Sequence, residues 1–267
     1  MDKYAVLGNP VSHSMSPLLH KFFAETTNEE LTYEAILVEN GEFEKTLDDF
    51  FAHGGKGCNI TVPCKLDAYK YADTLTVYAQ KARAVNTLKL CPDNTVIGDN
   101  TDGRGLVADL MRLQAEIKAG NILIIGAGGA AQGIIQPLLN EEPKLVTVAN
   151  RTFEKAQKLA DDYDERVEAS SFDALDNHYD LIINATSSSL KGELPKISPD
   201  IIRGASLVYD LMYSKDGSTV FTRKAMELGV GRAYDGFGML VGQAILSFEL
   251  WRGVRPDFEK ALKKFGR

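Results

Sequence analysis

Three small residues near the middle of the chain have the spacing of a dinucleotide-binding turn. Gly126, Gly128 and Ala131 fit the pattern G-x-G-x-x-A, directly after the apolar run at 122–125. The first glycine would permit a tight bend, the second would let the backbone approach a pyrophosphate, and the small third residue would let helix pack on strand. The helix N-terminus would offer unpaired N–H groups and a partial positive charge. The pattern predicts dinucleotide binding, and the alternative is a plain strand-to-helix turn.

The residues that end the next predicted strand bear on the choice of nucleotide. An NAD site usually carries Asp or Glu about 20 residues beyond the glycines, where the carboxylate binds the ribose 2′-hydroxyl. This chain has Asn150, Arg151 and Thr152 there, with Lys155 one helical turn later. An amide, a guanidinium and a hydroxyl suit a 2′-phosphate, which a carboxylate would repel. The sequence favours NADP over NAD, and the alternative is an ordinary helix cap at the surface.

Polar side chains also follow two predicted strands in the first third of the chain. Ser14 and Ser16 come after the first strand, and Asn59, Thr61 and Lys65 lie at the end of another. Ligands of parallel sheets bind beyond the carboxyl ends of the strands, so these side chains are candidates for a ligand site. The alternatives are ordinary helix capping for the serines and a solvated surface cation for the lysine.

Asp102 ends a polar segment, Asp-Asn-Thr-Asp at 99–102, between a predicted strand and a predicted helix. It either caps that helix or reaches a substrate. None of the four histidines lies in a comparable motif, although His13 is close enough to the serines to stay a minor candidate for an acid.

Composition bounds the class of protein. The chain has 267 residues, of which 44% are hydrophobic and 25% charged, enough for one large domain or two smaller ones. No apolar run approaches the ~18 residues of a membrane span, and the N-terminus has no signal-peptide layout. Three cysteines are too few for a disulfide framework or a zinc site, which predicts a reducing compartment. The net charge of −7 argues against a nucleic-acid partner.

Alternating strands and helices predict an α/β fold with parallel sheets. Strands are expected at 4–8, 31–38, 58–62, 84–88, 122–125, 144–149, 180–186 and 206–213. Helices are expected at 43–51, at 106–113, at 239–250 and from 256. A further helix is expected to begin at Pro17, capped by Ser16, with Leu18, Leu19, Phe22 and Phe23 on its buried face. Pro137 predicts either a kink or a late start of the helix that follows the glycines.

Taken in order, nine motifs resemble the shikimate dehydrogenase family over nearly the whole chain. They are Gly-Asn-Pro at 8–10, Ser-Met-Ser-Pro at 14–17, Asn-Ile-Thr-Val-Pro-Cys-Lys at 59–65, Ala-Val-Asn-Thr at 84–87, Gly-Asp-Asn-Thr-Asp-Gly at 98–103, Gly-Ala-Gly-Gly-Ala at 126–130, Asn-Arg-Thr at 150–152, Asn-Ala-Thr-Ser at 184–187 and Asp-Gly-Phe-Gly-Met-Leu-Val-Gly-Gln at 235–243. Each motif alone is modest, and their number and order make the resemblance strong.

The resemblance implies two α/β domains with a cleft between them, in which catalysis takes place. Residues 1–101 and 237–267 would form an open, twisted, mostly parallel substrate domain, and residues 102–236 a Rossmann-type NADP-binding domain. The implied reaction is the reversible, NADPH-dependent reduction of 3-dehydroshikimate to shikimate, a step of chorismate and aromatic amino-acid biosynthesis. The implied protein is a cytoplasmic monomer or homodimer that binds small molecules, without a metal, a nucleic acid or a membrane.

The resemblance also implies residue roles. Lys65 would be the general acid and base, and Asp102 would orient it and the substrate. Ser14, Ser16 and Tyr213 would hold the substrate carboxylate. Ring hydroxyls would be held, or the pocket shaped, by Asn59, Thr61, Asn86 and Gln243. The cofactor would be bound by Gly126, Ala127, Gly128, Gly129, Ala130, Asn150, Arg151, Thr152, Lys155, Thr186, Ser187 and Leu211, with Gly236 and Met239 at the nicotinamide end.

Three residues depart from the family pattern. Cys64 stands where Phe is expected, Ser189 where Gly is usual, and Lys155 where Arg is frequent. The lysine is expected to weaken 2′-phosphate binding, because it cannot make a bidentate contact. Two alternative functions remain open from the sequence. One is an NAD-linked quinate/shikimate dehydrogenase, and the other is a non-catalytic NADP-binding sensor on the same fold, which would have no need of Lys65 and Asp102.

Overall fold

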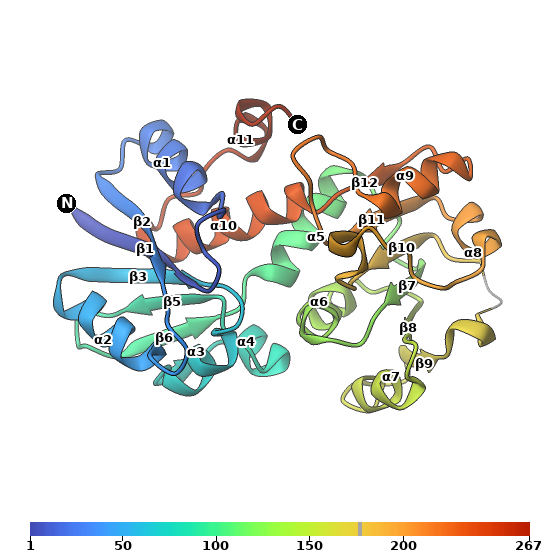
Figure 1. Cartoon of the computed structure of the whole chain (residues 1–267), viewed down its shortest axis with the longest axis horizontal. Helices are drawn as coiled ribbons and strands as arrows, with labels where there is room; N and C mark the ends of the chain where they lie inside the picture. The colour runs from blue at the N-terminus through green and yellow to red at the C-terminus, as the bar shows by residue number, and fades with distance from the viewer. Residues whose placement is uncertain (176–177) are drawn as a thin grey trace. The chain divides into compact units, whose positions relative to one another are not determined.

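Two six-stranded sheets organise the computed structural model, which describes residues 1–175 and 178–267 (Figure 1). The chain divides into a first unit of residues 1–105 and 241–267 and a second unit of residues 106–240. The boundaries fall inside helices α5 (Asp102–Arg112) and α10 (Phe237–Arg252), each four residues beyond the boundary expected from the sequence. The α/β fold class with two mostly parallel sheets is confirmed.

The sheet of the first unit has the order β2-β1-β3-β5-β6-β4. Its strands are β1 (Asp2–Gly8), β2 (Leu31–Leu37), β3 (Gly55–Ile60), β4 (Thr74–Leu75), β5 (Thr87–Leu90) and β6 (Val96–Asp99). β5 is antiparallel to both of its neighbours, and the other pairs are parallel. The carboxyl ends of β1, β3 and β6 therefore lie at one edge, where the polar motifs follow.

Helices cover both faces of this sheet. One face packs on α2 (Phe43–Ala52), α3 (Lys65–Tyr71) and α4 (Val77–Ala82), through buried residues such as Leu7, Leu47 and Ala68. On the other face lie α1 (Ser16–Thr27), the C-terminal part of α10 and, beside α1, the helix α11 (Phe258–Lys264). Tyr4 of β1 stacks on Trp251 of α10, with 4.7 Å between ring centroids. The end of the chain thus completes the core of the first unit.

The sheet of the second unit is wholly parallel, with the order β12-β11-β10-β7-β8-β9. Its strands are β7 (Asn121–Ile125), β8 (Leu145–Ala149), β9 (Val167–Ser170), β10 (Leu181–Asn184), β11 (Leu207–Asp210) and β12 (Ala233–Tyr234). Numbered within the unit, this order is 6-5-4-1-2-3, the doubly wound arrangement of dinucleotide-binding domains. The chain reverses its winding between β7 and β10, and ligands bind at such a switch point.

The run 122–125 is buried on both faces, as its continuous apolar character predicts. Ile122 and Ile124 pack with α5, α6 (Gly129–Leu139) and α7 (Phe153–Ala160). Leu123 and Ile125 pack on the opposite side with α8 (Pro199–Arg203) and α9 (Val220–Glu227). All four side chains are fully buried, and each burial stabilises the fold by about 1.5–3 kcal/mol.

Two expectations for α1 are wrong. The helix begins at Ser16, so this serine is not its cap; the cap position is Met15, which makes no side-chain hydrogen bond. Ser14 Oγ instead accepts a hydrogen bond from the backbone N–H of Ser16, at 3.2 Å. Leu18 is 54% exposed, because the buried face of α1 runs through Leu19 and Phe23, which are one helical turn apart.

Several boundaries differ from the sequence expectation. β3 begins at Gly55 and ends at Ile60, and β5 begins only at Thr87. The elements α3, β4 and α4 were not anticipated, because each has seven or fewer residues, too short to show a clear period. α6 begins at Gly129 and includes Pro137 in its last turn, so the late start is wrong. The short helices η1 (Phe172–Ala174) and η2 (Ser188–Lys191) were also missed, as were β9, β12, α8 and α9.

Candidate active site

Lys65 and Asp102 form an ion pair in the first unit, with 2.5 Å between Nζ and Oδ2. Each is the first residue of a helix: Lys65 begins α3 shortly after β3, and Asp102 begins α5 shortly after β6. The two side chains are 30% and 23% exposed, so both are partly shielded from water and still reachable by a ligand. The structure brings together the two residues that the sequence predicts as the catalytic pair.

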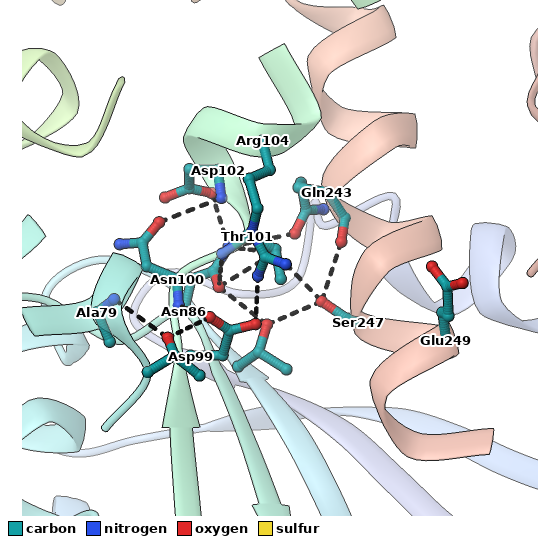
Figure 2. Close-up of polar contacts among 12 residues, drawn as sticks. Ala79, Asn86, Asp99, Asn100, Thr101, Asp102, Arg104, Gln243, Ser247 and Glu249 are labelled. Atoms are coloured by element: carbon teal, nitrogen blue, oxygen red, sulfur yellow. Dashed lines mark hydrogen bonds and ion pairs between the residues drawn. The ribbon is translucent and has the colours of Figure 1, made fainter. Parts of the chain in front are cut away.

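Asn86 fixes the other oxygen of the Asp102 carboxylate (Figure 2). Its Nδ2 donates to Asp102 Oδ1 at 2.8 Å and to Thr101 Oγ1 at 2.9 Å. Its Oδ1 accepts the backbone N–H of Thr101, also at 2.9 Å. Because Asn86 is only 2% exposed and its amide is engaged on both sides, it holds the carboxylate in one orientation.

A buried polar network extends from Asn86 to the last long helix. Gln243 Oε1 lies 3.4 Å from Asn86 Nδ2, and Ser247, one turn further along α10, accepts a hydrogen bond from Asn59 Nδ2 at 2.9 Å. Thr87 and Ser247 share a hydrogen bond of 2.8 Å. Three of the four residues predicted to line the ring-hydroxyl site, Asn59, Asn86 and Gln243, therefore belong to one network.

The hydrogen bonds of Asn59 define what it can offer a ligand. Its Nδ2 has three acceptors within 3.3 Å, on Asn86, Thr87 and Ser247, so both of its N–H groups are engaged. Its Oδ1 accepts the hydroxyl of Tyr33 at 2.8 Å and keeps a second lone pair. Asn59 is therefore suited to accept a hydrogen bond from a ligand hydroxyl.

Three members of this network were missed from the sequence: Tyr33, Thr87 and Ser247. Thr87 belongs to one of the nine motifs, so its position was already marked. Ser247 follows Gln243 by four residues in the predicted last helix, which places both on one helix face. Tyr33 carries no local signal, because its partner is 26 residues away in the chain.

Ser14 and Ser16, the predicted carboxylate ligands of the first unit, follow β1, and the loop after β1 meets the loop after β3 near Gly8. Ser16 is buried and Ser14 half-buried. The backbone N–H of Thr61 donates to Leu7 O at 2.9 Å, and a Cβ at Gly8 would lie 2.3 Å from Thr61 Cγ2. Only glycine therefore fits at position 8, and the side chain of Thr61 lies against the end of β1.

Asp99 anchors the turn that carries Asp102. This carboxylate is 3% exposed, accepts the Thr76 hydroxyl at 2.5 Å, and pairs with the guanidinium of Arg104 (Figure 2). Arg104 also lies over the Tyr78 ring, with 4.3 Å between Cζ and the ring centroid. The first turn of α5 is thus held to β6 and α4 through Arg104.

In the second unit, the glycine turn fits a pyrophosphate. Gly126 has φ +109°, a conformation that other residues rarely adopt. Gly128 is the cap residue of α6 and contributes no side-chain bond, so the first N–H groups of the helix remain for a ligand. A Cβ at Gly128 or Gly129 would meet no atom within 4 Å, which leaves an open cradle beside those N–H groups.

The loops after β8 and β10 line a pocket of about 280 Å³ in the second unit. Asn150, Arg151, Thr186 and Ser187, all predicted cofactor ligands, contribute to its wall. Asn150 Nδ2 donates to Thr152 O at 2.9 Å, which fixes the turn into α7. Lys155 is exposed on α7 and does not line this pocket.

The residues predicted at the nicotinamide end also lie in the second unit. Gly236 donates its N–H to Met212 O at 3.0 Å, and a Cβ there would lie 2.2 Å from Leu211 O, so position 236 requires glycine. Met239 N–H donates to the Tyr209 hydroxyl at 3.0 Å. Tyr213, 37% exposed, packs edge-on against Phe237 in this unit, whereas Ser14 and Ser16 belong to the first unit.

Two of the three departures from the family pattern have a structural role. Cys64 is 3% exposed and packs in the core beneath α2 and α3. Ser189 donates to Asp210 Oδ2 at 2.5 Å, and Thr219 donates to the same oxygen at 2.6 Å. Burial raises the pKa of Asp210, while these hydrogen bonds oppose the rise. Ser189 thus ties η2 to the end of β11.

The histidines take no part in the Lys65 site. His13 is exposed, and the side chain of His20 is fully buried beside Tyr33. Among the described residues no cluster of His, Cys, Asp and Glu has the arrangement of a metal site. In the same part of the chain, no helix has the length and apolar character needed to cross a bilayer.

Family models match three segments of the chain. The model "Shikimate dehydrogenase substrate binding domain" matches residues 6–88, "Shikimate / quinate 5-dehydrogenase" matches 109–191, and "Shikimate 5'-dehydrogenase C-terminal domain" matches 236–264. A relative from Vibrio cholerae named "Shikimate dehydrogenase (NADP(+))" is 51% identical over 99% of this chain and 95% of its own length.

Solved structures are similar over nearly the whole chain. The Ael1 enzyme from Pseudomonas putida has a TM-score of 0.95 and 41% identity, covering 99% of this chain and 98% of its own. The shikimate 5-dehydrogenase of Thermus thermophilus, solved with NADP(H) and shikimate, has a TM-score of 0.88 and 30% identity, covering 99% and 100%.

Proposed function

Because the chain belongs to the shikimate dehydrogenase family, we propose that it catalyses the reversible, NADPH-dependent reduction of 3-dehydroshikimate to shikimate. It is an oxidoreductase that uses NADP(H), and its reaction belongs to chorismate and aromatic amino-acid biosynthesis. The observation that supports this function most strongly is the ion pair of Lys65 and Asp102, with 2.5 Å between Nζ and Oδ2. Asn86 holds the other oxygen of the Asp102 carboxylate.

Lys65 is the general acid of the reduction. NADPH, when bound, supplies the hydride, and the ammonium of Lys65 gives a proton to the oxygen that becomes the new hydroxyl. Asp102 holds the lysine through Oδ2, and Asn86 holds Oδ1 of the same carboxylate, so the proton donor has a fixed direction. In the oxidation of shikimate the same lysine takes the proton back.

The first unit holds the substrate. Ser14 and Ser16 bind its carboxylate through their hydroxyls, and we propose Tyr213 as a further ligand of the carboxylate. Asn59 accepts a hydrogen bond from a ring hydroxyl through the lone pair of Oδ1 that the Tyr33 bond leaves, and Thr61 and Gln243 complete the lining. What supports this assignment is the common network of Asn59, Asn86 and Gln243 beside the ion pair.

The second unit holds the nucleotide. The cradle at 126–130 and the N-terminus of α6 bind the pyrophosphate, and Asn150 and Arg151 bind the 2′-phosphate of the adenosine ribose. The remaining predicted ligands, Thr152, Lys155, Thr186, Ser187, Leu211, Gly236 and Met239, contact other parts of the cofactor. We place residues 1–101 and 237–267 in the substrate domain and 102–236 in the NADP domain.

The alternative functions are less well supported. A relative named for NADP(+), with 51% identity over nearly the whole chain, argues against the NAD-linked enzyme. A non-catalytic sensor would not need the fixed ion pair of Lys65 and Asp102. We further propose that the enzyme acts in the cytoplasm and that it is a monomer or a homodimer. Sedimentation equilibrium of the purified protein would test the oligomeric state.

The direct test of the function is a spectrophotometric assay of nucleotide reduction at 340 nm. Shikimate with NADP⁺ is expected to give turnover. Far less turnover is expected when quinate replaces shikimate or when NAD⁺ replaces NADP⁺. Preferential turnover of quinate with NAD⁺ would replace the proposal by the catabolic enzyme. NADP⁺ binding without any turnover would support the sensor instead.

A further inference from the structure

The pocket in the second unit is lined by more cations than the family motifs account for. Beyond Arg151, its wall includes Lys191 at the end of η2 and Lys196 in the loop that follows. None of the three forms an ion pair within residues 1–175 and 178–267. Glu193 is the one carboxylate among the residues that line the pocket. The local charge is therefore about +2 on a chain whose net charge is −7.

This charge matches a phosphomonoester. Such a group carries between −1.5 and −2 charges near neutral pH and accepts several hydrogen bonds. Ser187 contributes an exposed hydroxyl to the same wall, and this hydroxyl makes no hydrogen bond with the described part of the chain. The neighbouring hydroxyl of Thr186 is already engaged, because it donates to Asn184 Oδ1 at 2.7 Å.

Lys191 belongs to the short helix η2, which is hydrogen-bonded to the core of the second unit through Ser189. Ser189, two residues earlier, donates to Asp210 Oδ2 at 2.5 Å and accepts a long hydrogen bond from Asn184 Nδ2 at 3.5 Å. Asp210 is fully buried at the end of β11, so this anchor belongs to the core of the second unit. Gly192, with φ +70°, ends η2 directly after the lysine.

We propose that Lys191 determines cofactor specificity in this chain by binding the 2′-phosphate of NADP(H) together with Arg151, and that Ser189 is its positioning residue. The inference rests on the proposed function and deepens it. Ser189 stands where the family pattern usually has glycine, and Lys155 stands where it frequently has arginine. Lys191 supplies from η2 a cation that compensates for the weaker contact of Lys155.

The test compares two mononucleotides by isothermal titration calorimetry at low ionic strength. Adenosine 2′,5′-bisphosphate and adenosine 5′-monophosphate differ only in the 2′-phosphate. The dissociation constant of the monophosphate divided by that of the bisphosphate is a ratio that reports 2′-phosphate recognition alone. Lys191→Ala is expected to weaken binding of the 2′,5′-bisphosphate roughly 3- to 5-fold, the range of a partly exposed ion pair, with binding of the 5′-monophosphate unchanged. Lys191→Arg is expected to keep the wild-type ratio.

Two further variants separate position from charge. Lys144→Ala removes an exposed lysine that precedes β8, at the opposite end of that strand from Arg151, and is expected to leave the ratio unchanged. Ser189→Gly keeps Lys191 and removes the hydrogen bond that fixes η2 to Asp210. This variant is expected to lower the preference for the 2′-phosphate about 2-fold, because a mobile cation binds less well than a fixed one.

The outcomes distinguish this inference from the proposed function. A wild-type ratio in Lys191→Ala, with the ratio lost in Arg151→Ala, would overturn the role of Lys191 and leave NADP specificity standing. Equal affinity of the wild-type protein for the two mononucleotides would overturn both. An unchanged ratio in Ser189→Gly would overturn the positioning role alone.

Discussion

At the scale of single residues, the proposed chemistry depends on the orientation of one carboxylate. Asp102 is held by Lys65 on one oxygen and by Asn86 on the other, while Asp99 and Arg104 anchor the turn that carries it. A carboxylate with both oxygens engaged does not rotate freely. In the proposed mechanism, the proton donor Lys65 therefore has a fixed direction before any substrate binds, as general acid catalysis requires.

Replacing Asp102 by asparagine is expected to lower kcat about 10²-fold, because the amide keeps the size of the side chain and removes the charge that orients Lys65. Steady-state kinetics at saturating shikimate and NADP⁺ measure this. Asp67→Asn is the matched control: Asp67 is an exposed carboxylate in the first turn of α3, and its loss changes the net charge equally. A kcat within 2-fold of wild type for Asp102→Asn would contradict the role.

We expect His20 to make the stability of the protein depend on pH. Its ring is fully buried, stacks on Tyr33 at 4.3 Å, and has no hydrogen-bond partner on either nitrogen within the described residues. Burial in this aromatic cluster lowers the pKa of His20 to about 3. The histidine is therefore neutral in the folded protein across the physiological range.

The free energy of unfolding is expected to fall as the pH drops from 6.5 towards 4. In this window the unfolded chain binds a proton at position 20 that the folded chain excludes, which costs up to about 1.4 kcal/mol per pH unit. His20→Phe keeps the stacking and removes the proton site, so its urea-unfolding free energy should depend less steeply on pH. His13→Phe, a change at an exposed ring, is the control. Identical slopes for wild type and His20→Phe would refute this explanation.

At the scale of elements, the sequence predicts four central strands of the second unit and misses its shorter elements β9, β12, α8 and α9. β7, β8, β10 and β11 are buried on both faces, so each is a continuous apolar run that can be recognised without knowing its neighbours. The segment 65–82 was missed because α3, β4 and α4 are short, and their positions depend on packing against β6 rather than on a local period.

The motifs of the candidate site were predictable, and its network was not. Lys65, Asn86 and Asp102 belong to motifs that carry the family resemblance. Glycines, prolines and hydroxyl-bearing residues in these motifs make them recognisable. Ser247 has no such context: its partner Thr87 is 160 residues away, and only the folded chain brings them together. Long-range polar contacts of this kind leave no trace in local sequence spacing.

A buried hydroxyl joins three elements of the second unit. Tyr209 of β11 donates to Asp109 of α5 at 2.7 Å and accepts the backbone N–H of Met239 of α10 at 3.0 Å. Burial raises the pKa of Tyr209 well above its ordinary value, and the nearby Asp109 adds to the rise. Gly238 leaves room for this contact, because a Cβ there would lie 1.9 Å from Asp109 Oδ2.

Tyr209→Phe is expected to lower the free energy of unfolding by about 1–2 kcal/mol, since the N–H of Met239 loses its acceptor and Asp109 loses a donor in a dry site. Urea denaturation measures the loss. Tyr234→Phe is the control, because the half-buried hydroxyl of Tyr234 makes no hydrogen bond with the described part of the chain. Equal destabilisation by the two changes would show that the three-way contact has no special role.

At the scale of the whole molecule, the candidate functional residues are divided between two units. The first of these units is made of two separate stretches of the chain. The first unit takes residues from both ends of the chain and carries Lys65, Asp102 and the Asn59 network, while the second unit carries the glycine cradle and the cationic pocket. Each unit has its own sheet and its own core. The glycines alone indicate that a nucleotide binds, and the proposed reaction depends on residues before and after them in the chain.

The turnover number of Lys65→Ala tests the central claim most directly. With shikimate and NADP⁺ both saturating, the variant is expected to lose about 10²–10⁴-fold in kcat, because its general acid and base is gone. Lys70→Ala, which removes an exposed lysine from the same helix, is expected to keep wild-type kcat. A near-normal kcat for Lys65→Ala under these conditions would contradict the assignment of Lys65 as the group that moves the proton.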